Sequence, residues 1–376
     1  MLEFLTLKPG AFGLDISDLS LKIVKLKKKR GVLNLASFGE AEIKPGIIEG
    51  GEIKDEEALA KIIKEALKKV KGEKLKTKYV IVSLPEEKAF LQVIQMPLMK
   101  EEELKKAILY EAENYIPLPI NQVYLDSQVI QPVYNHLDHT DVLIAALPKK
   151  TVDPYLNSIK KAGLQPKIFE IESQAISRTL IKNEVSPFPI LLIDFGANRT
   201  GFIIFSGYSL RFTVSIPVSS QKFTEAISRT FNIDLTEAEK LKIKYGFEEK
   251  VKVKIKNEKS EIEEEKGEIF EALIPTFTDL VEQVKKYINY YQTHASHEHL
   301  PPNGKGVSKI LLCGGGANLK GLTEFLTAEL KIPVELGNPW LNILPKPLKE
   351  VPELPFEKSL GYTTALGLAL REIKEK

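Results

Sequence analysis

Two short stretches of the sequence place an aspartate at the end of an apolar strand and before a tight turn of small residues. Residues 13–17 contain Asp15, and residues 192–196 contain Asp194. Small residues let backbone N–H groups approach phosphate oxygens closely, and an aspartate can hold a hydrated divalent cation. Two such turns together could therefore grip phosphates and a metal ion from opposite sides, whereas either turn alone is more typical of an ordinary hairpin.

Each of these turns continues into a second apolar strand. Lys22 lies seven positions after Asp15, on the return strand, from which its ammonium group could reach a phosphate. In the second half of the chain, Thr200 and Gly201 open the corresponding strand. Because the two halves begin alike, the sequence indicates an internal duplication with one phosphate-binding hairpin in each half.

A third stretch that could do chemistry follows a predicted buried strand at residues 309–313. The residues that follow this strand are Gly314, Gly315, Gly316, Ala317 and Asn318. Glycines leave room for a flat base or ribose to lie against the backbone at the start of a helix. The stretch is not a P-loop, since no Gly-Lys-Ser/Thr follows, and its glycine spacing does not match the dinucleotide-binding fingerprint.

A fourth candidate is a charged pair on a predicted helix at residues 236–245. Glu239 and Lys242 are three positions apart, so both side chains could face an adenosine from one side. A solvated ion pair explains the same spacing equally well. The pair therefore supports a nucleotide site only in combination with the other three stretches.

The elements that must position these residues follow from the hydrophobic pattern. In the first half we predict two strands within residues 11–26, a strand at 32–43, an amphipathic helix at 55–71 and a buried strand at 79–84. Residues 90–166 are predicted to form a separate α+β unit, with strands at 90–97, 123–131 and 141–147 and helices at 100–115 and 149–163.

The second half is predicted to begin at residue 190 with three strands. Alternation of lysine with apolar residues predicts an edge strand at 251–256, followed by an acidic turn or short linker at 260–267. A long helix is expected at 269–294 and a final helix at 359–373. This order repeats the strand-rich start of the first half.

Composition narrows the class of protein. The 376 residues could hold two ordinary domains or one two-lobed molecule. With 53 basic and 51 acidic residues, the formal net charge is +2, which gives no case for nucleic acid as a partner. No stretch approaches the roughly 18 apolar residues of a membrane-spanning helix, and the single cysteine, Cys313, suits a reducing compartment. We therefore expect a cytoplasmic protein.

These elements, in this order, resemble the nucleotide-binding core of the actin, chaperone and sugar-kinase superfamily. Within it the chain is similar to the PilM family of type IV pilus assembly proteins, close relatives of the cell-division protein FtsA. Three stretches carry the resemblance: Glu-Ala-Glu-Asn-Tyr-Ile-Pro at 111–117 with Val-Tyr-Leu-Asp at 123–126, Asp-Phe-Gly-Ala-Asn-Arg-Thr at 194–200, and Ala-Leu-Gly-Leu-Ala-Leu-Arg at 365–371. The resemblance covers nearly the whole chain.

The resemblance implies an α/β, actin-like fold of two lobes, with duplicated ribonuclease H-like halves and an inserted α+β subdomain called IC. It assigns residues 1–89 and 167–186 to the first half (subdomain IA) and residues 90–166 to subdomain IC. It assigns residues 187–230 and 305–376 to the second half (subdomain IIA) and residues 231–304 to subdomain IIB.

The resemblance also implies ATP and Mg²⁺ in the cleft between the halves. The first phosphate turn would comprise Asp15, Ser17, Ser20 and Lys22, and the second Asp194, Gly196, Asn198 and Thr200. Ribose or base would be contacted by Glu239 and Lys242, and adenosine by Gly314, Gly315, Gly316, Ala317 and Asn318. The metal ion would be held by Asp15 and Asp194, through water.

Two positions depart from the family pattern. Ser17 stands where the first turn usually has glycine. Ser173 stands where actin-like ATPases place a Gln or Glu that orients the attacking water, and its neighbour Glu172 is the remaining candidate for catalysis. We therefore expect at most slow ATP hydrolysis, with the nucleotide serving as a structural element or a slow switch.

The partner that the resemblance implies is PilN, a membrane protein whose short cytoplasmic N-terminal tail docks near subdomain IC. FtsA ends in an amphipathic membrane helix, whereas this chain ends soon after Arg371, so we expect attachment to the inner membrane only through partners. Other pilus assembly proteins, the assembly ATPase and self-association remain open. Two alternative functions also remain open: an FtsA-like filament protein of cell division, and a small-molecule kinase of the same superfamily.

Overall fold

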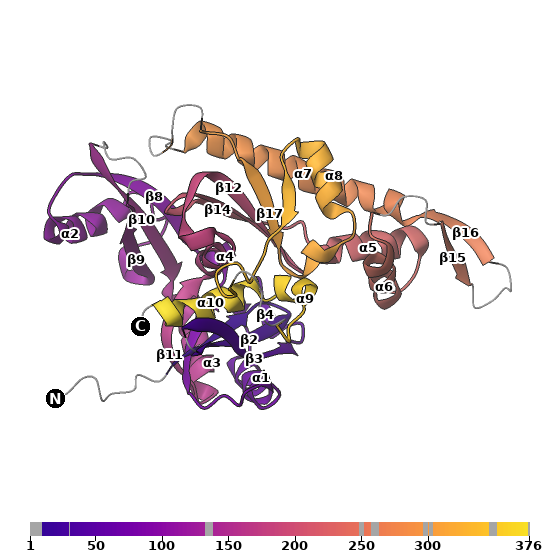
Figure 1. Cartoon of the computed structure of the whole chain (residues 1–376), viewed down its shortest axis with the longest axis horizontal. Helices are drawn as coiled ribbons and strands as arrows, with labels where there is room; N and C mark the ends of the chain where they lie inside the picture. Colours follow the sequence, from indigo (N-terminus) through magenta and orange to yellow (C-terminus); the bar gives the residue numbers. More distant parts are fainter. Residues whose placement is uncertain are drawn as a thin grey trace.

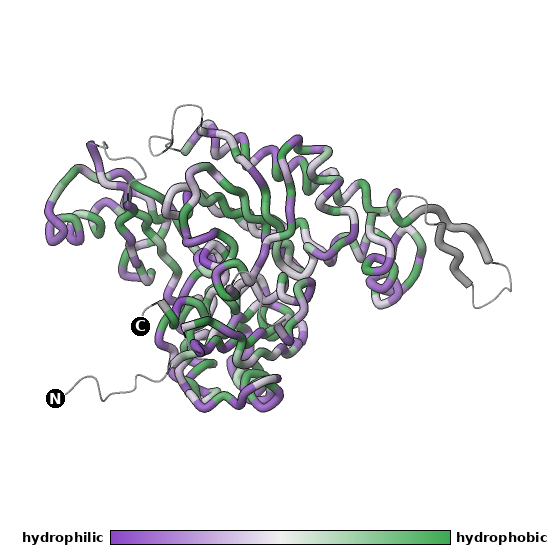
Figure 2. The backbone as a smooth tube through the Cα atoms, viewed as in Figure 1, coloured by the Kyte–Doolittle hydropathy of each residue, from purple (hydrophilic) through white to green (hydrophobic). Residues whose placement is uncertain are grey.

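Two large β-sheets form the centres of two lobes (Figure 1). The computed structural model describes residues 10–29, 31–131, 138–247, 252–256, 263–295, 300, 304–345 and 352–374. The strands near the middle of both lobes are largely hydrophobic, and hydrophilic residues lie along the outer helices (Figure 2). The pattern is that of a chain whose apolar side chains are buried on both sides of its sheets.

The first sheet has the strand order β11-β7-β1-β2-β3-β6. Its strands are β1 (Phe12–Ile16), β2 (Ser20–Lys29), β3 (Val32–Glu42), β6 (Lys71–Gly72), β7 (Tyr79–Leu84) and β11 (Gln165–Ile171). Strand β1 is antiparallel to β2 and parallel to β7, and its register sets Asp15 opposite Lys22. The carboxylate and the ammonium group singled out from the sequence are therefore cross-strand neighbours in one hairpin.

Two helices pack on the first sheet and share its core. They are α1 (Glu56–Lys68) and α3 (Lys149–Lys161). Helix α1 begins at Asp55, whose carboxylate accepts a hydrogen bond from the Ala58 N–H at 2.9 Å, as an N-cap does. Helix α3, which the sequence analysis placed in the insertion, contributes Val152, Tyr155 and Ile159 to the core of the first lobe. It therefore packs with the first lobe.

The second sheet has the strand order β14-β13-β12-β17-β18. Its strands are β12 (Ser186–Phe195), β13 (Thr200–Gly207), β14 (Ser209–Ile216), β17 (Lys309–Cys313) and β18 (Val334–Leu336). Strand β12 is antiparallel to β13 and parallel to β17, which repeats the relation of β1 to β2 and β7. The expected duplicated, actin-like halves are thereby confirmed.

The helices of the second lobe enclose the largest hydrophobic core. They are α5 (Ser220–Phe231), α6 (Leu235–Tyr245), α7 (Ile269–His294) and α8 (Leu322–Leu330). Beside them β15 (Lys252–Lys256) pairs with β16 (Glu263–Glu268) in an antiparallel hairpin. The prediction of an acidic turn at 260–267 was wrong over β16, because a run of glutamates shows no alternation and pairing with β15 decides its conformation.

The inserted α+β subdomain is confirmed as a small sheet with a core of its own. Its strand order is β8-β10-β9, and both pairings are antiparallel. The elements are β8 (Phe90–Pro97), α2 (Glu101–Ala112), β9 (Val123–Val129) and β10 (His139–Pro148). Side chains of α2 bury against this sheet and not against the cores of the two lobes.

Two helices lie between the large sheets. They are α4 (Glu172–Leu180) and α10 (Thr363–Lys374), the latter preceded by α9 (Phe356–Leu360). Helix α10 packs on β1, β2 and β7, and α4 packs on the core of the second sheet. The two helices also contact each other closely, so the chain connects the lobes through this pair. The final helix, expected to be continuous over 359–373, is interrupted at Gly361.

The remaining elements are short. They are β4 (Ile48–Glu49), β5 (Glu52–Ile53) and the 3₁₀ helices η2 (Glu86–Lys88), η3 (Ile120–Gln122), η4 (Lys182–Glu184) and η5 (Gly315–Asn318). Within the described residues, none of the helices combines the length and the apolar character required to cross a bilayer.

Candidate functional site

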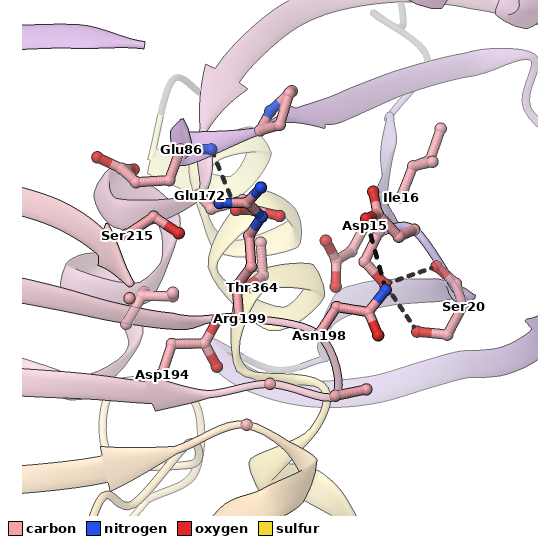
Figure 3. Close-up of a pocket in the computed structure, with 18 of the residues that line it drawn as sticks. Asp15, Ile16, Ser20, Glu86, Glu172, Asp194, Asn198, Arg199, Ser215 and Thr364 are labelled. Carbon is pink, nitrogen blue, oxygen red and sulfur yellow. Dashed lines mark hydrogen bonds between the residues drawn. The ribbon is translucent and has the colours of Figure 1, made fainter. Parts of the chain in front are cut away.

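A cavity of about 440 Å³ lies between the two lobes, at the turns of the β1–β2 and β12–β13 hairpins. The residues singled out from the sequence that line it are Asp15, Ser17, Ser20, Lys22, Glu172, Asp194, Gly196, Asn198, Gly314 and Gly315. Figure 3 shows part of its wall, with Asp15 and Ser20 from the first hairpin and Asp194 and Asn198 from the second. The fold thus brings both turns to one space.

The first hairpin presents an ammonium group and hydroxyls beside a buried carboxylate. Asp15 accepts a hydrogen bond from Ser83 Oγ at 3.0 Å. Lys22 Nζ donates to Ser20 Oγ at 2.9 Å, and the hydroxyls of Ser17 and Ser20 are 3.0 Å apart. Burial raises the pKa of Asp15, and the charge of Lys22 and the Ser83 hydrogen bond oppose the shift. The carboxylate would therefore favour a cation nearby.

The second hairpin is closed by close backbone contacts that require glycine. The Gly196 N–H donates to the Arg199 carbonyl at 3.0 Å, and a Cβ at Gly196 would lie 2.7 Å from the same oxygen. Gly314 has a φ of 85°, and a Cβ there would collide with the Asp194 carboxylate. Asp194 is thus held at the junction of β12 and the loop after β17, facing the cavity.

Only the first two residues of the glycine-rich stretch line the cavity. A Cβ at Gly315 would have no atom within 4 Å, so this glycine leaves open space. A Cβ at Gly316 would lie 2.7 Å from an aromatic ring of the second lobe. Ala317 is buried in the core of that lobe, and Asn318 Nδ2 donates to the Glu357 carbonyl at 2.8 Å. These three residues build the loop and do not face the cavity.

Glu239 and Lys242 also lie outside the cavity. Lys242 Nζ donates to the Ser220 carbonyl at 3.0 Å, to the Ser220 hydroxyl at 2.7 Å and to the Thr224 hydroxyl at 2.8 Å. It also forms an ion pair with Glu239 at 2.7 Å. Burial lowers the pKa of Lys242, and Glu239 opposes the shift. The pair ties α6 to the start of α5, behind Gly316, whose Cβ would approach Ser220 Cβ to 3.0 Å.

Thr200 is fully buried away from the cavity. Its hydroxyl donates to the Val218 carbonyl at 2.7 Å, which fixes the segment after β14 against the start of β13. Its neighbour Gly201 lines the cavity instead. Successive residues of a strand point to opposite faces, so a one-residue difference decides which of the two lines the site.

Asp18 and Arg199, which were not predicted as site residues, make contacts around the two turns. Asp18 accepts hydrogen bonds from both N–H groups of residues 50–51 at 3.0 Å and from Asn198 Nδ2 at 3.5 Å. Arg199 Nε lies 3.4 Å from Glu87. Asp18 and Arg199 both lie in the turns that were identified from the sequence. Their charge and their position in these turns could have indicated a role at the site. The Asp18–Asn198 hydrogen bond and the Glu87–Arg199 ion pair link the first lobe to the second, whereas the hydrogen bonds from residues 50–51 lie within the first lobe.

Glu172 lies on a different wall of the cavity, at the start of α4. Its carboxylate accepts a hydrogen bond from the Glu86 N–H at 3.3 Å, and the Glu86 carboxylate accepts one from the Ser173 N–H at 3.2 Å (Figure 3). Burial raises the pKa of Glu172 well above its usual range, and the negative charges of Asp15 and Asp194 add to the shift. Burial and the neighbouring carboxylates therefore favour protonation of Glu172 relative to an exposed glutamate.

The carboxylates that line the cavity favour a cation that is coordinated mainly by water or by a bound ligand. Burial raises the pKa of Asp194 to about 6, with Asp15 adding to the shift and Lys22 opposing it. In the part of the chain that the structure describes, no three His, Cys, Asp or Glu side chains are grouped closely enough to hold a metal ion. A divalent cation here would depend mainly on water and phosphate oxygens, with Asp15 and Asp194 beside it.

The raised pKa of Asp194 predicts that the ligand-free chain becomes more stable on mild acidification. The pKa of Asp194 is about 6 in the folded chain, whereas an unperturbed aspartate has a pKa of 3.8. Between these values the folded state binds more protons than the unfolded state, so stability falls as pH rises toward and through 6. One pKa unit corresponds to about 1.4 kcal/mol. The free energy of unfolding should therefore be about 1 kcal/mol larger at pH 5 than at pH 7.5 because of Asp194 alone.

Denaturant titrations of the ligand-free chain at pH 5 and pH 7.5 measure this difference. In Asp194→Asn the difference should shrink by about 1 kcal/mol. The part that remains comes from the other buried carboxyls, whose pKa values are also raised. An equal difference in both proteins would contradict the assigned shift.

The chain is similar to known proteins over nearly its whole length. A family model described as type IV pilus assembly protein PilM matches residues 13–373. A chain of a solved PilM–PilN type IV pilus biogenesis complex is similar with a TM-score of 0.75 and 28% identity, over 97% of this chain and 99% of that chain.

More distant relatives share the fold. ADP-bound MreB5 of Spiroplasma citri is similar with a TM-score of 0.57 and 14% identity, over 98% of this chain and 97% of that chain. Cell division protein FtsA of Pseudomonas aeruginosa is 24% identical over 226 residues, which is 58% of this chain and 50% of that protein. The chain thus spans about half the length of the curated relatives it matches first. These similarities agree with an actin-like fold.

Proposed function

Because the chain belongs to the PilM family of type IV pilus assembly proteins, we propose that it is an ATP-binding, actin-like scaffold of the pilus assembly platform at the inner membrane. The observation that supports this most strongly is the cavity between two duplicated hairpins, in a chain that matches the family over almost its whole length. ATP is abundant in the cytoplasm, so we place the protein on the cytoplasmic side, attached to the membrane through partners.

The ligand that we propose for the cavity is Mg²⁺·ATP. The bound Mg²⁺ would supply positive charge between the phosphates and the carboxylates. Asp15 and Asp194 would face its hydration shell from the two lobes, and Lys22 would bind a phosphate oxygen. The open space beside Gly315 is the place for the flat adenosine. The relatives support nucleotide as the ligand class, since the similar MreB5 structure contains ADP.

Hydrolysis of this ATP is expected to be slow. A residue that activates water must accept its proton, and the raised pKa of Glu172 disfavours the ionised form that could do so. Bound Mg²⁺ would lower the pKa of Glu172 and restore some of this capacity. Ser173, at the position next to it, has no carboxyl or amide to orient water. We therefore propose a nucleotide that is retained as a structural element or slow switch.

Filling the open space beside Gly315 should block the adenosine. Gly315→Val is expected to weaken Mg²⁺·ATP binding by at least about 10-fold, or about 1.4 kcal/mol, because the new side chain would occupy the cavity. The fold should tolerate it, since no atom lies within 4 Å of the new Cβ. Calorimetric titration measures the affinity. Gly306→Val, outside the cavity, is the matched control and should bind as the parent does.

The partner that we propose is the N-terminal cytoplasmic tail of PilN, docking beside the inserted subdomain. The similarity to a solved PilM–PilN complex over nearly the whole chain supports this choice. The test is calorimetric titration of a synthetic peptide with the sequence of this tail, from the same organism, with and without Mg²⁺·ATP. A scrambled peptide of the same composition is the control.

We expect the tail peptide to bind and the scrambled peptide to fail. A difference between the two nucleotide conditions would show that nucleotide acts as a switch. If neither condition gives binding, the pilus-scaffold function is contradicted. The FtsA-like filament protein and the small-molecule kinase would then be the functions to test next.

A further inference from the structure

The inserted sheet, formed by β8, β9 and β10, follows the first lobe in the chain and packs Leu147 of β10 on the core of that lobe, and it is ion-paired to the second lobe. The strands before and after it, β7 and β11, pair with each other in the first sheet. Asp141 on β10, however, forms an ion pair with Arg211 on β14 of the second lobe, with Oδ2 and Nη1 2.6 Å apart. Their side chains are only 8% and 5% exposed. Separating a buried pair would leave two uncompensated charges, so this connection resists opening.

Each member of the pair also contacts residues of its own sheet or lobe. Arg211 Nε donates to the Ser206 carbonyl at 3.3 Å. Arg211 also acts on Tyr291 of α7, where burial raises the pKa of the hydroxyl to about 12 and the guanidinium opposes the shift. On the other side, Asp141 Oδ1 lies 3.4 Å from His139 Nε2 within the inserted sheet. The pair is therefore buried, and each of its members has further partners on its own side.

Strand β14 connects this ion pair directly to the nucleotide cavity. Residues at every second position of a regular strand share one face, so Thr213 and Ser215 point to the same side. Arg211 lies two positions before Thr213 on the same strand, at an irregularity in the pairing of β14 with β13. Thr213 hydrogen-bonds the Glu86 side chain, which lines the cavity, and Ser215 itself lines the cavity (Figure 3). A displacement of the second lobe at the cavity would therefore displace Arg211 as well.

We propose that the Asp141–Arg211 ion pair makes the inserted sheet move with the second lobe, so that nucleotide in the cavity sets the position of the inserted sheet against the first lobe. A second cavity of about 320 Å³ lies in the seam that would change. Its lining includes Gln128 and Leu143 of the inserted sheet and, facing them from the first lobe, Glu170 of β11. The inference rests on the proposed nucleotide site. It adds that nucleotide binding there changes the position of the inserted sheet.

Distances between spin labels test this movement. Lys61→Cys on α1 and Glu102→Cys on α2 report the first lobe against the inserted subdomain. Lys61→Cys and Glu329→Cys on α8 report the first lobe against the second. All three positions are exposed, and the native Cys313 is buried and stays unlabelled. Pulsed double electron–electron resonance is recorded with and without Mg²⁺ and a non-hydrolysable ATP analogue.

In the parent chain we expect both distances to shift when the analogue binds. In the double variant Asp141→Ala with Arg211→Ala, the distance between the lobes should still shift, whereas the distance to the inserted subdomain should stay constant. Removing both partners avoids an unpaired buried charge. Arg211→Lys, which keeps the cation, should retain both shifts. If the double variant does not fold, as judged by circular dichroism, Asp141→Asn replaces it.

The inference is overturned if, in the parent chain, the distance between the lobes shifts and the distance to the inserted subdomain does not. It is overturned as well if the distance to the inserted subdomain still shifts in the double variant. It is also overturned if the analogue binds and neither distance changes. Calorimetry on the same samples separates these results from a failure of the proposed function. If the analogue does not bind to the parent, the nucleotide site is contradicted and the inference is withdrawn with it.

Discussion

Replacing Asp194 by alanine is expected to weaken Mg²⁺·ATP binding by at least about 100-fold, equivalent to about 2.7 kcal/mol. Asp194 faces the cavity from the junction of β12 and the loop after β17, and it is the carboxylate that the second lobe offers to the cation. Without it, the hydrated metal ion keeps only Asp15 of the first lobe. The loss should be smaller for ATP without Mg²⁺, because the carboxylate acts on the cation and not on the phosphates.

The Asp194→Ala chain is expected to stay folded. Burial raises the pKa of this carboxyl to about 6, so at neutral pH the folded state is destabilised by its charge. Removing the charge should leave the thermal unfolding midpoint of the ligand-free chain unchanged or higher. Calorimetric titration and thermal unfolding measure the two effects. Asp279→Ala, an exposed position on α7, is the matched control and should change neither.

Unchanged affinity for Mg²⁺·ATP in the Asp194→Ala chain would contradict the second phosphate turn. A loss of affinity together with a large fall in the unfolding midpoint would instead show that Asp194 is needed for the fold. The two measurements therefore separate a role in binding from a role in structure.

Gly367→Ala is expected to destabilise the chain by about 3 kcal/mol or more. Gly367 lies where α10 crosses α4, and a Cβ there would lie 2.5 Å from the Ala175 carbonyl carbon and 2.6 Å from Thr179 Oγ1. The nearest atoms include backbone, which cannot rotate away, so the two helices must separate. In an isolated helix the same change would stabilise by about 1 kcal/mol, so the sign distinguishes close packing from helix propensity.

Denaturant unfolding followed by the fluorescence of Trp340 measures this effect. The single tryptophan is buried in the same core cluster as residues of α10, so its emission reports that packing. Gly306→Ala is the control, because its Cβ would meet only an ordinary contact at 3.9 Å. A stability of Gly367→Ala equal to that of the parent would show that α4 and α10 are not packed as described.

Much of the fold followed from local patterns in the sequence. Period-two alternation with small-residue turns predicted both hairpins, and the structure gives β1–β2 and β12–β13 the same pairing. The helical periodicity of residues 55–71 predicted α1, because its apolar positions recur on one face. The acidic segment that forms β16 could not be predicted, since it has no alternation and its conformation depends on β15.

The candidate site was predicted in part, for a similar reason. Asp15 and Asp194 were found because a turn and its flanking strands are local. The orientation of Thr200 was not, because the side chain alternates with Gly201 and the register is set by pairing with β12. The spacing of Lys242 is that of a ligand-facing residue. Its ammonium group, however, donates hydrogen bonds to Ser220 and Thr224 of α5. Nothing in the spacing of one helix shows what packs against it.

The sequence by itself determined that this chain has two halves, each with an aspartate at a small-residue turn, and an α+β unit inserted within the first half. These features depend on contacts within one hairpin or helix, which residue order specifies directly. Only the tertiary structure decided which side chains share the cavity and which join the lobes. Asp18 with Asn198, and Asp141 with Arg211, are 180 and 70 positions apart in the chain. Such pairs meet only because packed sheets bring distant segments together, and residue spacing carries no information about that packing.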